Sequence, residues 1–270
     1  MKLKLIRHLW GIDQPWETAF SAIAREGYGG IEAPLVSGND EDRFLSLRKR
    51  HGLDYVAMAF TGGESVRDHV KLFEEQGRRA IELGAIQLTA HGGSDSWEQR
   101  DAGAFFTEAL AIERSLKLPI AHETHRGRIL FNPWVTRRLL EKFESLQLCC
   151  DFSHWVCVAE RTNWDDRDAS ILKLCAQRCI HIHARVGYPE GPQVPDPSAP
   201  EYSSDLTAHE SWWDAIFASQ RARGMQVSTV TPEFGPPGYL HTLPHTNVPV
   251  ADLSKVCKWM AGRIAARFGN

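Results

Sequence analysis

The chain has 270 residues, of which 43% are hydrophobic and 24% charged, and its formal net charge is -3. This composition is typical of one large globular domain and lacks the strongly basic balance that nucleic-acid binding requires. No apolar run approaches the roughly 18 residues of a membrane-spanning helix. We therefore expect neither a nucleic acid nor a membrane as a partner.

The amino-terminal segment and the cysteines indicate the cellular compartment of the protein. The first residues, MKLKLIRHLWGID, lack the long apolar run and the small-residue cleavage site of a secretory signal. The six cysteines form no CxxC pair and show no regular spacing, which favours buried, reduced thiols over disulfides. Both observations predict a cytoplasmic protein.

Predicted strands and helices alternate along almost the whole chain. The strands are predicted at residues 2–10, 29–34, 53–60, 85–91, 118–124, 147–153, 179–186 and 227–234. The helices are predicted at residues 16–27, 41–52, 65–84, 98–116, 133–144, near 166–177 and at 250–267. Repeated strand–helix units predict an α/β protein, a (β/α)8 TIM barrel that occupies residues 1–270 as a single domain. No glycine-rich dinucleotide fingerprint follows the first strand, which disfavours an open sheet.

Two stretches between these elements are long and rich in proline and glycine. They span residues 184–204 and 234–249, and each follows a predicted strand. In a barrel both would lie at the carboxyl ends of the strands, where active sites are built. We expect them to form lids or walls of a pocket.

Four side chains that can bind a cation close four successive apolar segments. These side chains are Glu123, Asp151, His183 and Glu233. If the strands are parallel neighbours, all four emerge at the same edge of the sheet. Three carboxylates would repel one another there unless a cation joined them. The pattern therefore predicts a site for a divalent metal ion, with Mn2+, Mg2+, Co2+ and Zn2+ as the candidates.

The segments around these residues resemble the xylose isomerase-like TIM barrels, which include sugar isomerases and epimerases, inosose dehydratases and apurinic endonucleases. The resemblance is most specific in the segments AHETHRGR (121–128), CCDFSHW (149–155), IHIHARV (180–186) and TPEFGPPGY (231–239). It implies that Glu123, Asp151, His183 and Glu233 hold the metal. It also implies that His154, in the Asp-x-x-His pair, lies beside the metal and contacts substrate.

Other residues near the strand ends are candidates for substrate binding. His8, Glu32 and His91 end the first, second and fourth predicted strands, so they face the same mouth, although anchoring of the core or a loop is an alternative role. By strand alternation, His125 shares the side of Glu123 and Arg185 shares the side of His183. The full set of predicted substrate contacts is His8, Glu32, His91, His125, His154, Trp155 and Arg185, with Trp155 stacking on a sugar face.

Together these features predict a divalent-metal-dependent isomerase or epimerase of a sugar or keto-sugar. A metal that chelates a hydroxyl and the adjacent carbonyl acidifies the neighbouring C–H, and the proton moves through a metal-bound enediolate. Glu123 and Glu233 are the predicted catalytic acid and base, a role that the family's epimerases imply. The predicted partner is a small sugar, non-phosphorylated because no glycine-rich phosphate cradle follows the last strands, and a homo-oligomer is left open.

Three alternatives remain from the sequence. The same enolate could eliminate a leaving group, as in a lyase or dehydratase that acts on a keto-sugar, a 3-keto-glycoside or a keto-inositol. A phosphodiesterase like the apurinic endonucleases would need more metal ligands, for which His91 is a candidate, but Ser198 stands where a further histidine would be expected. A barrel that only binds sugar is disfavoured by the complete set of metal ligands.

Overall fold

The strands form a closed parallel barrel, as the sequence pattern predicts. The computed structural model describes residues 1–269, without the side chains of residues 166 and 167. Each described strand pairs with the next in sequence order, and the last closes onto the first. The strands are β1 (Lys2–His8), β2 (Gly30–Pro34), β3 (Asp54–Phe60), β4 (Gln87–His91), β5 (Ile120–Glu123), β6 (Leu148–Cys150), β7 (Cys179–His183) and β8 (Val227–Thr231).

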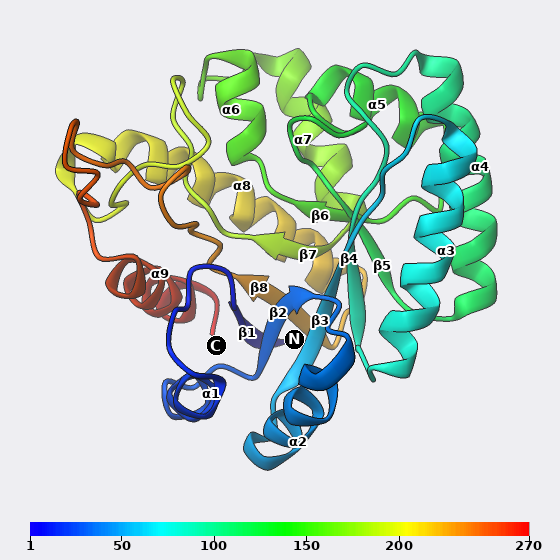
Figure 1. Ribbon diagram of the computed structural model, residues 1–270. Coiled ribbons are helices and arrows are strands. Elements are labelled where there is room, and N and C mark those ends of the chain that lie inside the picture. The colour runs from blue at the N-terminus through cyan, green and yellow to red at the C-terminus, as the bar shows by residue number, and fades with distance from the viewer. Residues whose placement is uncertain (270) are drawn as a thin grey trace.

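Helices cover the outside of this barrel, and long loops gather beyond the carboxyl ends of the strands (Figure 1). The helices are α1 (Trp16–Arg25), α2 (Glu41–His51), α3 (Val66–Glu82), α4 (Gln99–Leu116), α5 (Pro133–Lys142), α6 (Ser153–Ala159), α7 (Asp166–Arg178), α8 (Ser203–Ala222) and α9 (Leu253–Phe268), with 3-10 turns η1 (Gly38–Asp40) and η2 (Pro200–Tyr202). Among residues 1–269, no helix is long and apolar enough to cross a membrane.

Alternation along the strands separates an apolar layer from a polar interior. In β7, Ile182 joins the apolar cluster between barrel and helices, whereas His181 and His183 contact Glu32 of β2 inside the barrel. The apolar layer supplies most of the folding free energy by burial. The interior carries hydrogen-bonded polar groups that lead up to the carboxyl ends of the strands.

Five predicted strands end earlier than the sequence pattern indicates; those predicted at 2–10 and 118–124 end at His8 and Glu123. The segment predicted as a strand at 147–153 leaves the sheet after Cys150, because the backbone N–H and the hydroxyl of Ser153 both donate to the Asp151 carboxylate. This turn begins α6, a helix that the sequence pattern does not predict. The strands predicted at 179–186 and 227–234 likewise end at His183 and Thr231.

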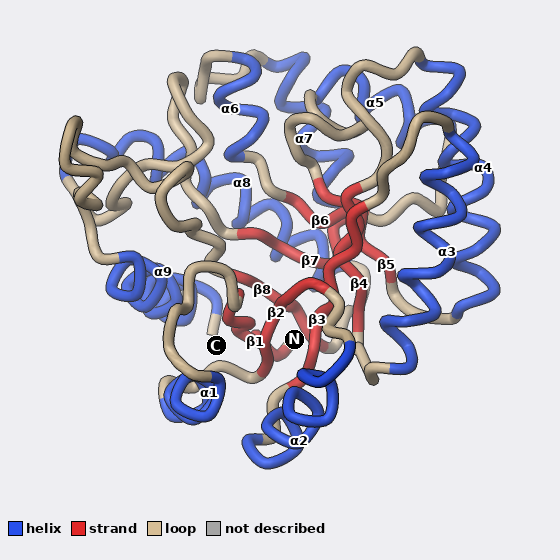
Figure 2. Tube along the Cα trace, in the orientation of Figure 1, coloured by secondary structure: helices blue, strands red, loops and turns tan. Residues whose placement is uncertain are grey.

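The two long loops after β7 and β8 lie side by side at the mouth (Figure 2). The Gln193 amide clamps Gly235 by accepting from its N–H at 2.7 Å and donating to its carbonyl at 3.1 Å. Gly235 must be glycine, because a Cβ atom there would lie 2.2 Å from the ring of Trp10. The clamp and this close contact fix the loops as one wall of the mouth.

Candidate metal centre

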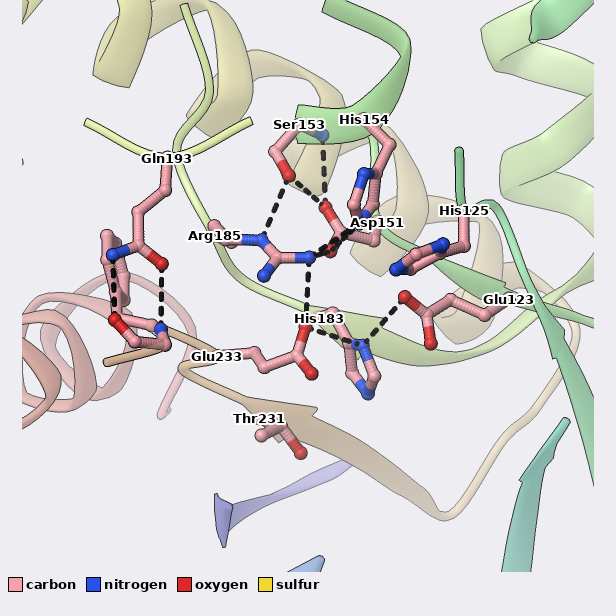
Figure 3. A network of polar contacts seen from close by, with 12 residues as sticks. Glu123, His125, Asp151, Ser153, His154, His183, Arg185, Gln193, Thr231 and Glu233 are labelled. Carbon is pink, nitrogen blue, oxygen red and sulfur yellow. Dashed lines mark hydrogen bonds and ion pairs between the residues drawn. The ribbon is translucent and has the colours of Figure 1, made fainter. Parts of the chain in front are cut away.

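The four predicted metal ligands converge at the carboxyl ends of neighbouring strands. Glu123 and His183 are the last residues of β5 and β7, Asp151 directly follows β6, and Glu233 lies two residues beyond β8. One ligand atom from each residue lies within 4.8 Å of the corresponding atom of every other. All four side chains are buried, and they face a common centre in Figure 3.

Several atoms that face this centre lack hydrogen bonds. Among the described residues, no donor or acceptor in hydrogen-bonding geometry meets either carboxylate oxygen of Glu123, Nδ1 of His183 or Oε2 of Glu233. A buried polar atom without a partner costs about 1–3 kcal/mol. One cation at the centre would accept a lone pair from each of Glu123, His183 and Glu233. Three carboxylates with one imidazole form a donor set that suits Mg2+, Mn2+, Co2+ or Zn2+, so the residues fit a divalent ion.

The charges around the centre also favour a cation. Burial raises the pKa of Asp151 to about 7, with Arg185 opposing the shift and Glu233 and Glu123 adding to it. Although burial opposes charge on His183, the anionic groups around it raise its pKa well above the usual value. Proton uptake at these two residues partly offsets the repulsion among the carboxylates. A divalent ion would replace that proton on Nδ1 of His183.

The orientation of His183 is set from inside the barrel by Glu32. Nε2 of His183 lies 3.1 Å from both oxygens of Glu32, so Nδ1 faces the other ligands. Glu32 also accepts from the hydroxyls of Thr89 and Thr231 at 2.6 and 2.5 Å. The sequence pattern predicts a substrate contact for Glu32. The structure instead places it behind His183, where a carboxylate orients a metal-binding imidazole.

Asp151 is held by groups on both of its oxygens. Oδ1 accepts from Ser153, and Oδ2 accepts from the Arg185 guanidinium at 2.5 Å. The same Arg185 nitrogen lies 3.3 Å from Glu233 and 2.7 Å from Nε2 of His154. Arg185, a predicted substrate contact, therefore lies among the candidate metal ligands and contacts two of them, Asp151 and Glu233.

Three imidazoles form a row beside Glu123. His91 contacts the Glu123 carboxylate, the rings of His91 and His125 are 5.2 Å apart, and those of His125 and His154 are 3.9 Å apart. Burial lowers the pKa of His125 to about 4 and that of His154 well below its usual value. These three predicted contacts are thus brought together, and the lowered pKa values keep His125 and His154 neutral, so both can donate or accept hydrogen bonds.

The two remaining predicted contacts lie in different environments. Nε2 of His8 is 3.6 Å from Glu233, and His8 lines the cavity at the mouth. Trp155 is fully buried, and its indole N–H donates to the Leu130 carbonyl at 2.9 Å. The early start of α6 turns Trp155 into the apolar core, so it does not reach the mouth.

A cavity of about 570 Å³ opens over the centre. His91, His125, Arg185 and Glu233 form its polar side, and Tyr239 covers the Arg185 guanidinium with its ring centroid 4.8 Å away. Burial raises the pKa of Tyr239, so the phenol is neutral. The sequence gives no signal for Tyr239, because it lies in an irregular proline-rich loop.

The roles of Ser153 and Gln193 at the site are also not predicted from the sequence. Ser153 would be recognisable only as a residue two positions after Asp151, a spacing typical of an Asx turn. Gln193 acts through backbone groups of Gly235, which is distant in sequence. No local pattern predicts such a contact.

Comparison with known proteins places the fold in a family. The sequence model of the family described as xylose isomerase-like TIM barrel matches residues 20–196. No curated protein matches the chain by sequence.

Solved structures with the same fold have diverse names. A 3-keto-D-glucoside 4-epimerase from E. coli has a TM-score of 0.62 at 14% identity, over 98% of this chain and 100% of that one. A probable 3-DHS dehydratase of petrobactin synthesis from Bacillus anthracis has a TM-score of 0.62 at 12% identity, over 97% and 98%. A xylose isomerase-like TIM barrel protein from Mycobacterium smegmatis, in complex with magnesium, has a TM-score of 0.65 at 11% identity, over 98% and 96%. At these identities the likeness establishes the fold.

Proposed function

The chain belongs to the xylose isomerase-like TIM barrel family, and from this premise we propose that it is a divalent-metal-dependent isomerase or epimerase of a sugar or keto-sugar. The observation that carries the proposal is the convergence of Glu123, Asp151, His183 and Glu233. Among the described residues, no hydrogen bond reaches the Glu123 oxygens, Nδ1 of His183 or Oε2 of Glu233. These four residues would hold Mg2+, Mn2+, Co2+ or Zn2+. A bound divalent ion would polarise a substrate carbonyl and acidify the adjacent C–H.

Glu123 and Glu233 are the proposed proton-transfer residues. Oε1 of Glu123 and Oε2 of Glu233 lie 3.6 and 3.1 Å from Nδ1 of His183. Although burial opposes charge, His91 and His183 hold the pKa of Glu123 well below its usual value. The pKa of Glu233 is about 2, because His183 and Arg185 outweigh its burial. Both carboxylates are therefore ionised at neutral pH, and each can accept a proton.

The remaining groups would bind and orient the sugar. His91, His125 and His154 offer ring nitrogens to hydroxyl groups, and Arg185 offers a fixed positive charge to an oxygen that becomes negative. Tyr239 and the loop fixed by Gln193 limit the access of water. If one glutamate removes a proton from one face, and the other, after taking a proton from solvent, delivers that proton to the opposite face, the product is an epimer.

Elimination is the second candidate function. The row of histidines beside Glu123 places imidazole N–H groups close to the base, where they can donate a hydrogen bond to a hydroxyl group that leaves the adjacent carbon. A dehydratase is also among the proteins with this fold. A lyase would act on a keto-sugar, a 3-keto-glycoside or a keto-inositol with a leaving group next to the acidic C–H.

The test combines metal analysis with deuterium uptake. Purified protein is analysed for bound metal, then incubated in D2O with ketoses, keto-inositols and 3-keto-glycosides, and exchange of the C–H beside the carbonyl is followed by NMR. We expect a bound divalent ion, exchange with at least one substrate class, and loss of exchange on chelation. Chelation should also lower the melting temperature, because the clustered carboxylates then repel.

The product distinguishes the two candidate functions. Exchange with formation of an epimer or an aldose supports the isomerase, and formation of an unsaturated ketone supports the lyase. Failure to bind any of the four metals, or absence of exchange from all three classes, would overturn the proposal.

A further inference from the structure

One side of the cavity over the metal centre is apolar. Trp10 and Trp16 follow β1, Pro34 ends β2 with Leu35 and Val36 directly after it, and Met58 and Phe60 belong to β3. Together with Leu9 and Ala33, these side chains form a surface that we call the apolar wall. The polar side consists of His8 and of residues that follow β4, β5, β7 and β8.

Backbone groups of the apolar wall are committed elsewhere. The carbonyls of Ala33 and Pro34 accept from the hydroxyl of the buried Tyr55. The N–H and carbonyl of Phe60 are both bonded by the Gln76 side chain at 2.9 Å. The N–H of Trp10 donates to Nδ1 of His8. The N–H groups of Trp10 and Phe60 therefore already have acceptors, and the wall's side-chain donors are the indole N–H groups of Trp10 and Trp16.

The apolar wall is both rigid and adjacent to the reacting groups. Trp16 packs edge-on against Phe44, with ring centroids 5.7 Å apart. Phe60 stacks on His91 at 4.3 Å, and His91 contacts Glu123. Phe60 nevertheless stays 41% exposed. A fixed aromatic surface that remains uncovered beside a polar site gains free energy when an apolar group covers it.

We propose that the substrate is a glycoside whose aglycone is an apolar, planar group, and that the aglycone lies against the apolar wall. The inference rests on the proposed function, because the sugar part must reach Glu123 and Glu233. A cavity of about 570 Å³ lies within the usual range of roughly 300–1,000 Å³ for small-molecule sites and has room for both parts. A free sugar would either leave the wall uncovered or turn hydroxyl groups toward side chains that offer them few hydrogen bonds.

The test compares matched ligands that lack a carbonyl and therefore cannot turn over. Phenyl and methyl glycosides of glucose, galactose and xylose, in both anomers, are titrated against metal-loaded wild-type protein by tryptophan fluorescence and ligand-observed NMR. We expect the phenyl glycoside to bind about tenfold or more tightly than its methyl partner in at least one series. Equal affinities in every pair would overturn the proposal.

Variants of the apolar wall test whether the phenyl group binds there. Val36→Asn introduces a polar amide at similar volume and should bring the phenyl-to-methyl affinity ratio close to one, whereas Val36→Ile should retain the ratio. Trp259→Ala, on the outer helix α9, removes an exposed aromatic ring and should leave the ratio unchanged. A ratio that survives Val36→Asn in a folded protein would place the phenyl group elsewhere and refute the inference.

Deuterium exchange separates this inference from the proposed function. Exchange from simple keto-sugars with equal phenyl and methyl affinities would support the metal-dependent isomerase and refute the proposal of an apolar aglycone. Tighter binding of the phenyl glycosides without exchange from any keto-sugar would support the apolar wall as a binding surface and refute the proposed reaction.

Discussion

The two halves of the barrel end in different kinds of surface. The last four strands lead to Glu123, Asp151, His183 and Glu233, which meet within 4.8 Å. The first three strands lead mainly to apolar side chains, and Glu32 in this half supports His183 from behind. The same strand–helix unit therefore carries candidate metal ligands in one half and an apolar surface in the other. Under the proposals above, the first surface carries the chemistry and the second selects the substrate, and variants in each half test that division.

Replacing either proposed proton-transfer residue should have the largest effect. Glu123→Gln and Glu233→Gln keep the side-chain shape but remove the basic oxygen, so deuterium exchange should fall by about 10²–10⁴-fold. Metal content should decrease less, because an amide oxygen can still coordinate. Exchange and metal content are measured together for each variant.

Glu190→Gln is the matched control, since Glu190 is an exposed residue in the loop after β7 and should be silent. Full exchange in both site variants with metal bound would refute a two-glutamate proton transfer. The base would then have to be another group at the mouth.

Glu32→Gln tests whether the first half contributes to the metal centre through His183. The variant weakens the contact that fixes Nδ1 toward the other ligands, and metal affinity should fall about 10–100-fold. Glu113→Gln is the control, because Glu113 makes a similar 2.7 Å contact with His122 in the helix layer, away from the metal centre. Competition with a chromophoric chelator gives both affinities. An equal loss in the two variants would indicate general destabilisation instead of orientation of His183.

His154→Ala should weaken substrate binding while metal is retained. His154 contacts the Arg185 nitrogen at 2.7 Å and lies beside the four ligands without joining them. Loss of a single hydrogen bond should raise KM about tenfold, with a smaller change in kcat. Steady-state kinetics and metal analysis on the same preparation check this. Loss of metal in parallel with activity would make His154 part of the metal centre.

The fold and the four converging residues could be predicted from the sequence because each depends on a local pattern. Apolar segments that alternate with amphipathic helices predict the barrel, and the structure confirms that fold. Parallel order then brings residues at the strand ends together without any knowledge of loop geometry. Glu123 and His183 end their strands, and Asp151 lies directly after β6, so small errors in strand length did not matter.

The surroundings of the site depend on contacts that no local pattern specifies. Residues 147–153 appear as one apolar strand, but the Asx turn at Ser153 starts α6 and buries Trp155 in the core. Tyr239 reaches Arg185 from a loop without periodicity. The apolar wall was also missed, because apolar residues such as Val36 and Phe60 at a strand end resemble ordinary core residues until the cavity is seen.

The smallest expected effect is a change in stability with pH, caused by a buried histidine that contacts the loop after β7. His209 of α8 is fully buried; its Nδ1–H donates to the Asp205 carbonyl, and its Nε2 accepts from the Gly187 N–H in the loop after β7. Burial lowers its pKa from 6.5 to about 4. Because the folded state disfavours protonation, its contribution to stability is present above pH 6.5 and is lost as the pH falls toward 4. Between pH 7.5 and 5.5, this group should cost about 1 kcal/mol of unfolding free energy. Urea unfolding should show a smaller loss of unfolding free energy between pH 7.5 and 5.5 in His209→Gln. The control His51→Gln, at the end of α2, should show the same loss as the wild type. An identical pH dependence in wild type and His209→Gln would mean that His209 does not titrate in this range.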